Sequence, residues 1–288
     1  MKNSIQMKKA ANYKNMNSMV DFNKLCFDNM AIIHEKNGHK VMIKQYSVPL
    51  KEELPIYRYV RLSYLIDAIN NRRLFVPSIK QFSDLIEKNG CKKYDDLQLV
   101  RPVPAYKDKL RNKKIDNEMD GVLSMCAKCW TLDKRSDGTI GESMLMWRTY
   151  ASNEIVCRIG TTIKDVVDSI ISIESDIIFA DVNYGRNSSL NIFESVLFNK
   201  SIYYDHEQEI RMLYLTKNKN GTYININPLT MLKEITLSPF IPPQAASFVI
   251  SQLRNICREN PQIVMRISSI NEYSGGLPEY MNSNKVWR

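Results

Sequence analysis

The chain has 288 residues, and its 40 Lys and Arg outnumber its 31 Asp and Glu by nine. Hydrophobic residues make up 44% and charged residues 25%, which is typical of a globular protein and excludes a disordered or fibrous chain. The sequence has no apolar run long enough to span a membrane and no signal-peptide core, so we expect a cytoplasmic protein without membrane association.

The N-terminal region differs in composition from the rest of the chain. Residues 1–50 are rich in Lys, Asn and Met, and we expect a basic extension with a short helix over 19–30 and a strand over 40–46. We expect residues 51–288 to form a single α+β domain, interrupted by a charged, turn-rich basic insertion near 89–120.

Regular periodicity begins with a short strand at residues 57–59. Apolar residues three and four apart over 62–69 share one face of a helix. A strand over 74–76 ends at a proline, and Ser78 can cap a second helix that runs to about residue 88.

Beyond residue 121, strands and helices are mixed. Strands are predicted over 122–130, 155–159, 177–184, 209–215, 224–226, 235–237 and 264–267. Helices are predicted over 142–151, 162–171, 190–200 and 245–258. These elements lack the regular spacing of βαβ units, so we predict an α+β fold whose core is a mixed, mainly antiparallel sheet with flanking helices.

The charge excess belongs to the first 120 residues, which hold 23 basic and 14 acidic residues, while the remainder is balanced. A one-sided basic surface attracts phosphate backbones. A solvated, Lys-rich surface would explain the same excess without any partner. The candidate nucleic-acid contacts are Lys107, Lys109, Arg111, Lys113 and Lys114.

No strong metal motif is present in the sequence. Cys126 and Cys129 form a CxxC pair, but no second pair follows at zinc spacing, and on a strand the two side chains would point to opposite faces. HExxH and glycine-rich phosphate loops are also missing from the sequence. We therefore predict free, buried thiols and no metal.

Two clusters have side chains suited to chemistry. Arg58, between Tyr57 and Tyr59, could hold a phosphate or carboxylate with its planar guanidinium, or could simply face solvent on a strand. Glu207 and Glu209 precede Arg211 at alternate positions, so on a strand all three would share one face. Two such carboxylates can differ in pKa, although an exposed row of salt bridges would show the same pattern.

Two further clusters lie on predicted helices. Trp147 and Tyr150 stand three apart, which is typical of core but also suits one wall of a pocket. Asp84 and Glu87 lie at a helix start, where they favour the helix dipole and need no function.

Taken in chain order, these short boxes form a recognisable series between Tyr57 and Arg254. They are Tyr57-Arg58-Tyr59, Phe82-x-Asp84-x-x-Glu87, Met146-Trp147-x-x-Tyr150-Ala151 and Glu207-x-Glu209-x-Arg211. The series resembles a large uncharacterised bacterial domain family that is common in mobile and phage-defence loci. Thr149 occupies a position that is usually His in that family, so no general base is expected there.

The layout also resembles the ADP-ribosyltransferase fold, with Arg58 on the first core strand and Glu209 on a late strand. The resemblance implies an NAD-dependent ADP-ribosyltransferase, a toxin or defence effector with a possible antitoxin partner. It implies NAD as substrate and no metal. The basic first 120 residues make nucleic acid the favoured acceptor, with RNA favoured over DNA. The implied catalytic residues are Glu209, Arg58 and Glu207, and the implied NAD-binding residues are Arg58, Tyr59, Ser78, Ser124, Trp147 and Tyr150.

Two other functions fit the same residues. A metal-independent nuclease could use Glu207, Glu209, His206 and Lys200. A non-enzymatic, basic nucleic-acid-binding module would use the Glu-x-Glu-x-Arg row only to hold strands together.

Overall fold

The computed structural model describes residues 30–82, 120–135, 137–151, 154–185 and 192–270, with only the backbone described for 192, 193 and 195. Three expectations lie outside these residues. They are the helix over 19–30 except its last residue, the box with Asp84 and Glu87, and the basic insertion with its lysines and Arg111.

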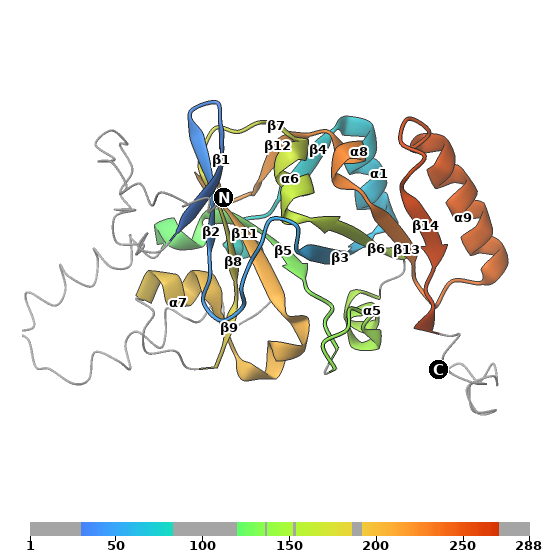
Figure 1. Cartoon of the computed structure of the whole chain (residues 1–288), viewed down its shortest axis with the longest axis horizontal. Coiled ribbons are helices and arrows are strands. Elements are labelled where there is room, and N and C mark those ends of the chain that lie inside the picture. The colour runs from blue at the N-terminus through green and yellow to red at the C-terminus, as the bar shows by residue number, and fades with distance from the viewer. Residues whose placement is uncertain (1–29, 83–119, 136, 152–153, 186–191, 271–288) are drawn as a thin grey trace, which may run out of the picture.

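A large, mainly antiparallel sheet forms the centre of the described chain and confirms the predicted α+β fold (Figure 1). Its parallel pairs are β2 with β8 and β13 with β14. In spatial order the strands are β1 (Ala31–Lys36), β2 (His39–Lys44), β8 (Ile177–Asp181), β11 (Glu209–Lys217), β5 (Met125–Thr131), β3 (Pro55–Arg61), β6 (Val156–Thr162), β13 (Glu234–Leu237) and β14 (Val264–Ile267).

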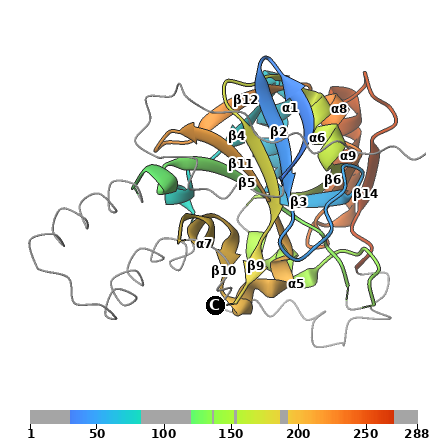
Figure 2. The same ribbon diagram turned by 60° about the vertical axis from the view of Figure 1, so that its left-hand side comes forward.

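Helices and a smaller sheet cover one face of this sheet (Figures 1 and 2). The main core lies between these layers, and the inward residues of β8, Ile177 and Phe179, belong to it. The covering elements are α1 (Leu62–Asn71), α6 (Ile163–Ser169), α8 (Pro228–Met231), α9 (Pro243–Ile256) and the sheet of β4 (Arg73–Val76), β12 (Thr222–Ile226) and β7 (Ile170–Ser172).

The opposite face of the sheet carries smaller elements. Ile178 and Ala180 of β8 point there and pack with α7 (Ile192–Phe198), because side chains alternate along a strand. Buried residues of α5 (Met144–Tyr150) pack against Tyr59 of β3 and Val156 of β6. The short elements are η2 (Ile79–Gln81), β9 (Asn183–Tyr184), β10 (Asn199–Lys200) and η4 (Ile202–Glu207).

Several predicted boundaries were wrong. The helix predicted over 190–200 ends at Phe198, because Asn199 and Lys200 form strand β10. The helix predicted over 162–171 is capped by Thr162, as expected, but ends at Ser169, and Ile170 starts strand β7. Ile170 pairs with Ile226 of β12, a long-range contact that overrides local helical periodicity. The strand predicted over 122–130 begins only at Met125, because residues 120–123 form a helical turn.

Part of the expected N-terminal extension belongs to the central sheet. Residues 31–44 form the β1–β2 hairpin, whose second strand lies parallel to β8. The hairpin turn is Asn37-Gly38, and both residues have positive φ angles, which suits a tight two-residue turn. The predicted boundary at residue 50, between an N-terminal extension and the domain, stays a prediction. In the described part of the chain, no helix is long and apolar enough to cross a membrane.

The sheet is only loosely joined between β3 and β5. These strands pair at one position, Tyr57 with Thr131, whereas β3 pairs with β6 and β11 pairs with β5 over seven positions each. Backbone groups and side chains near this split are therefore available for contacts other than a regular ladder. The candidate site lies here.

Candidate active site

A hollow at the split between β3 and β5 brings together five of the residues singled out from sequence. Arg58 and Tyr59 come from β3, Tyr150 from α5, Glu207 from η4 and Glu209 from the start of β11. The other lining residues, which sequence reasoning did not select for a site, are Tyr57, Cys129, Trp130, Thr131 and Met146.

Arg58 reaches into the split from the core side of β3. Ile56 and Val60, its alternate neighbours, pack into the main core. The guanidinium Nη1 of Arg58 donates to the carbonyl oxygen of Cys129 at 2.5 Å. Its Nε is buried and has no hydrogen-bond partner among the described residues, and the same is true of Nε1 of Trp130. Buried N–H groups without partners cost about 1–3 kcal/mol each, so two at one hollow suggest a ligand.

Glu209 lies between two cations. Its Oε1 is 2.7 Å from Nε of Arg211, and its Oε2 is 3.4 Å from Nζ of Lys200. Burial would raise the pKa of this carboxyl, but the Arg211 and Lys200 charges, with a hydrogen bond from Cys129, hold the pKa well below its ordinary value. The carboxylate therefore stays ionised.

Glu207 behaves in the opposite way. The sequence predicted Glu207 on the same strand as Glu209, but this was wrong, because β11 begins at Glu209 and Glu207 ends the 3₁₀ helix η4. Burial raises the pKa of Glu207 despite its 2.6 Å ion pair with Lys200. The two carboxyls at the hollow thus differ in proton affinity, as the spacing predicted.

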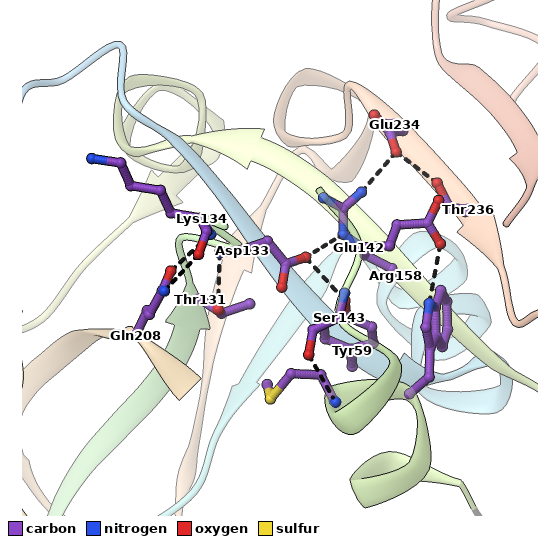
Figure 3. Close-up of polar contacts among 12 residues, drawn as sticks. Tyr59, Thr131, Asp133, Lys134, Glu142, Ser143, Arg158, Gln208, Glu234 and Thr236 are labelled. Carbon is purple, nitrogen blue, oxygen red and sulfur yellow. Dashed lines mark hydrogen bonds and ion pairs between the residues drawn. The ribbon is translucent and has the colours of Figure 1, made fainter. Parts of the chain in front are cut away.

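Gln208 produces the turn between the two carboxyls. Its backbone is left-handed, with φ of 44°. Its side-chain amide accepts from the backbone N–H of Lys134 at 2.7 Å and donates to the carbonyl of Lys134 at 2.6 Å (Figure 3). The paired bonds fix the turn to the segment that follows β5, so Glu207 and Glu209 both reach the hollow.

Aromatic rings form another part of the wall of the hollow. Tyr59 stacks with Tyr150 at 6.0 Å between centroids, and Trp147 meets the Tyr59 ring edge-on at 4.7 Å. Burial of the hydroxyl raises the pKa of Tyr150 to about 12, and Glu207 adds to the rise, although 40% of the side chain is exposed. Trp147 is fully buried behind Tyr59, so it supports the wall without lining the hollow.

A buried polar network holds this wall in place (Figure 3). Asp133 accepts from the Tyr59 hydroxyl at 3.0 Å and from Nε of Arg158 at 2.5 Å. The backbone N–H of Ser143 donates to the Tyr59 oxygen at 3.1 Å, which joins β3 to the segment before α5. The Arg158 guanidinium also lies 3.6 Å from the Tyr57 ring centroid and 3.0 Å from Glu234.

The remaining predicted site residues lie elsewhere. Ser78 and Ser124 are buried and do not line the hollow; their hydroxyls donate to the carbonyls of Leu123 and Asp120. Ser78 instead caps η2. The predicted cap is confirmed, but the predicted helix to about residue 88 is wrong, because η2 ends at Gln81 and Phe82 is extended. The five basic residues from Lys107 to Lys114 lie outside the described residues.

The CxxC side chains point to opposite faces, as the strand pattern predicted, but the predicted burial is wrong for Cys129, which is only partly buried. Cys126 is buried in the main core, whereas Cys129 lines the hollow, and both are free thiols. No group of three or more His, Cys, Asp or Glu side chains that could hold a metal ion is found in the described ranges.

Comparison with known proteins gives limited likeness. No protein-family model matches the chain, and no curated protein matches it. Three solved structures of Thermus sp. 2.9 DarT match much of its length. The complex with ADP-ribosylated ssDNA has 11% identity and a TM-score of 0.34, covering 76% of this chain and 95% of that one. The complex with NAD+ has 12% identity and a TM-score of 0.33, covering 76% of this chain and 97% of that one. The complex with carba-NAD+ has 10% identity and a TM-score of 0.33, covering 77% of this chain and 99% of that one. TM-scores this far below 0.5 do not establish a shared fold.

Proposed function

We propose that the protein is an NAD-dependent ADP-ribosyltransferase whose reaction takes place in the hollow between β3 and β5. The observation that supports this most is that one hollow is lined both by Arg58 and Trp130, each with a buried N–H that lacks a partner among the described residues, and by two carboxyls of different proton affinity. The donors suit an anionic, hydrogen-bond-accepting ligand, and the carboxyls suit cleavage of a glycosidic bond.

In this proposal, Arg58 and the rings bind the substrate. The planar guanidinium of Arg58 holds a phosphate of NAD through its unused donors, since it forms bidentate contacts that a lysine cannot. Tyr150, which is 40% exposed, offers its ring to the nicotinamide, and the buried Tyr59 stacks on it and holds it in place. The partner of the Trp130 N–H is a substrate oxygen. Ser78 and Ser124 would contact ribose only after leaving their backbone acceptors, so their assignment stays a prediction.

Glu209 stabilises the transition state. Loss of nicotinamide leaves an oxocarbenium-like ribose, and a fixed negative charge beside it lowers the barrier. The Arg211 and Lys200 cations keep Glu209 ionised and fix its position, so little reorganisation is needed during the reaction. No metal ion enters this mechanism.

Glu207 serves the acceptor. Its raised pKa brings it closer to the range in which a carboxylate can take up a proton from an attacking hydroxyl or amine. We infer that the acceptor is nucleic acid, because the basic excess lies in the first 120 residues. RNA in place of DNA is a further part of the proposal, which charge does not decide and the acceptor assay tests. A toxin or defence effector, controlled by an antitoxin protein in the cytoplasm, would fit this activity.

The experiment measures nicotinamide release and label transfer from labelled NAD, with RNA, DNA and protein as acceptors. We expect Arg58→Lys to reduce both, because lysine keeps the charge but loses the fork. Arg61→Lys, at the exposed end of the same strand, is the matched control. NAD should also raise the melting temperature of the wild type and not that of Arg58→Lys.

Two outcomes contradict the proposal. One is a folded protein that releases no nicotinamide with any acceptor and gains no thermal stability from NAD. The other is cleavage of RNA in the absence of NAD, which would favour the nuclease that uses Glu207, Glu209, His206 and Lys200. Equal activity of Arg58→Lys and wild type would show that Arg58 does not bind the phosphate of NAD.

A further inference from the structure

The small sheet of β4, β12 and β7 has one buried and one exposed face. Its inward residues, which include Leu74 of β4 and Ile224 of β12, pack into the main core. Because side chains alternate along a strand, their neighbours point outward. The outward residues of β4 and β12 are Arg73, Phe75, Tyr223 and Asn225.

Two aromatic rings lie side by side on the outer face. Phe75 and Tyr223 are directly opposite in the strand register, with centroids 5.1 Å apart and ring planes at 51°. They remain 36% and 49% exposed. The guanidinium carbon of Arg73 lies 4.1 Å from the Tyr223 centroid. Asp67 holds that guanidinium through bonds to Nη2 at 3.0 Å and Nε at 3.3 Å. The face is thus a preformed surface of two rings and a planar cation.

The turn before β12 fixes one ring and adds charge. A Cβ atom on Gly221 would lie 2.7 Å from Cζ of Phe75, so the Phe75 ring rests against the glycine itself. Lys219, in the same turn, has a side chain that is 68% exposed and lies 3.5 Å from Asp120, which also pairs with Lys80. Arg72, next to Arg73, is exposed as well. Basic side chains therefore border the rings.

We propose that this face binds a single-stranded polynucleotide, with bases stacked on Phe75 and Tyr223 and phosphates held by Arg72 and Lys219. Unpaired bases offer flat faces of any sequence to aromatic side chains, whereas a duplex hides them. A cross-strand aromatic pair also stabilises a sheet, but that role does not require the exposed cations that complement a phosphate backbone. The inference rests on the proposed function in one respect only, namely that the bound polynucleotide is the acceptor of ADP-ribose.

The location of this face determines which part of the strand it binds. Both views place β4 and β12 at the upper side of the molecule and α5, beside the hollow, at the lower side (Figures 1 and 2). The face therefore holds nucleotides that flank the acceptor nucleotide, and it contributes affinity only for strands that extend across the molecule.

The experiment measures binding of fluorescently labelled oligo-dT and oligo-U to the full chain by anisotropy, without NAD. The probes have about 20 nucleotides, more than the roughly 4–16 that one stacking platform covers. We expect Tyr223→Ala and Phe75→Ala each to weaken binding roughly tenfold, the range expected when one base no longer stacks. Tyr223→Trp keeps a stacking ring and should retain affinity.

Tyr64→Ala is the matched control. Like Tyr223, Tyr64 is an exposed tyrosine beside an arginine: it is 62% exposed, and Cζ of Arg61 lies 5.7 Å from its ring centroid. It stands on helix α1 and not on the small sheet, so its removal should leave affinity unchanged. Wild-type affinity in Tyr223→Ala, equal weakening by Tyr64→Ala, or equally tight binding of a duplex of the same length would each overturn the inference. Thermal melting of every variant shows that it is folded.

The two proposals fail in different ways. Ring-dependent binding by a protein that never releases nicotinamide supports this inference and overturns the proposed function. Nicotinamide release by a protein whose oligonucleotide binding ignores both rings does the reverse.

Discussion

Glu209 owes its ionised state to two neighbours, and this makes it structurally important whatever its chemistry. Arg211, fully buried, would lose its close carboxylate partner if Glu209 were neutral. Removing the Glu209 charge takes a negative charge from beside both Arg211 and Lys200 in a medium of low dielectric constant, which destabilises the two buried cations. Loss of activity in a Glu209 variant therefore has to be separated from loss of folding.

Glu209→Gln should lower the free energy of unfolding by about 3–5 kcal/mol near neutral pH. Because the pKa of Glu209 is lower in the folded state, its contribution is fully present above the unfolded value of about 4.3 and is lost as the pH falls through the lower, folded value. Urea denaturation of both proteins near neutral pH and at about pH 3 should show a smaller difference in acid. An equal difference at both pH values would contradict the ion-pair explanation.

Tyr59→Phe tests the network beneath the aromatic wall. The variant keeps the ring but removes the hydroxyl that donates to Asp133 and accepts from Ser143. We expect the free energy of unfolding to fall by about 1–3 kcal/mol, since buried polar groups lose a partner. Tyr64→Phe, on the exposed side of α1, should change it little. Equal changes in the two variants would show that the network contributes no stability.

The sequence indicated the residues that bring charge to the hollow but not those that position them. Arg58, Glu207 and Glu209 were selected because their residue types and spacing suit such chemistry and because their order along the chain resembles the ADP-ribosyltransferase layout. Asp133 and Gln208 lie in turn-like sequence, and their roles come from contacts with Arg158 and Lys134, which are far away in the chain. Single-sequence periodicity carries no information on such pairs.

At the scale of elements, local patterns predicted most strands and helices. Their apolar residues recur at the spacing that places them on the face packed against the neighbouring layer. The exceptions depend on partners. Ile170 leaves the helical pattern because β12 lies beside it. The split between β3 and β5, where the candidate site lies, could not be predicted, since strand order and pairing length come from the whole chain.

Gly221→Ala tests how the turn before β12 is packed. Gly221 has φ of +76°, and an added Cβ would also lie 2.9 Å from the backbone oxygen of Val76. Gly38→Ala is the matched control, because its φ is +79° but nothing lies within 4 Å of its added Cβ. Both variants lose the glycine preference for left-handed backbone.

Gly221→Ala should therefore be less stable than Gly38→Ala by about 1–3 kcal/mol, the usual cost of overpacking. Chemical denaturation of the two variants measures this difference directly. Equal destabilisation would mean that Phe75 and the neighbouring backbone move aside without cost, and that the ring is not held by the turn.

At the scale of the whole molecule, charge and chemistry occupy different parts of the chain. Apart from Tyr57, Arg58 and Tyr59 on β3, the hollow is built from segments beyond residue 128, whereas the first 120 residues carry the entire basic excess. A surface that attracts phosphate backbones by charge alone acts before any bond is broken. Because the basic excess lies mainly outside the hollow, we predict that affinity for nucleic acid falls as salt concentration rises. The size of this salt effect should depend on basic residues outside the hollow.

Replacement of the basic cluster by glutamine should reduce this salt dependence. The logarithm of affinity falls linearly with the logarithm of salt concentration, and each single-strand phosphate that the protein neutralises adds about 0.7 to the steepness of that line. The line should therefore become less steep by about 0.7 for every phosphate that the variant no longer binds. The replaced residues are Lys107, Lys109, Arg111, Lys113 and Lys114. Arg254→Gln with Arg258→Gln, on and just after α9 at the far edge of the sheet, provides the control. If the cluster variant and the control reduce the slope equally per charge removed, affinity follows net charge, and the cluster is not a docking site.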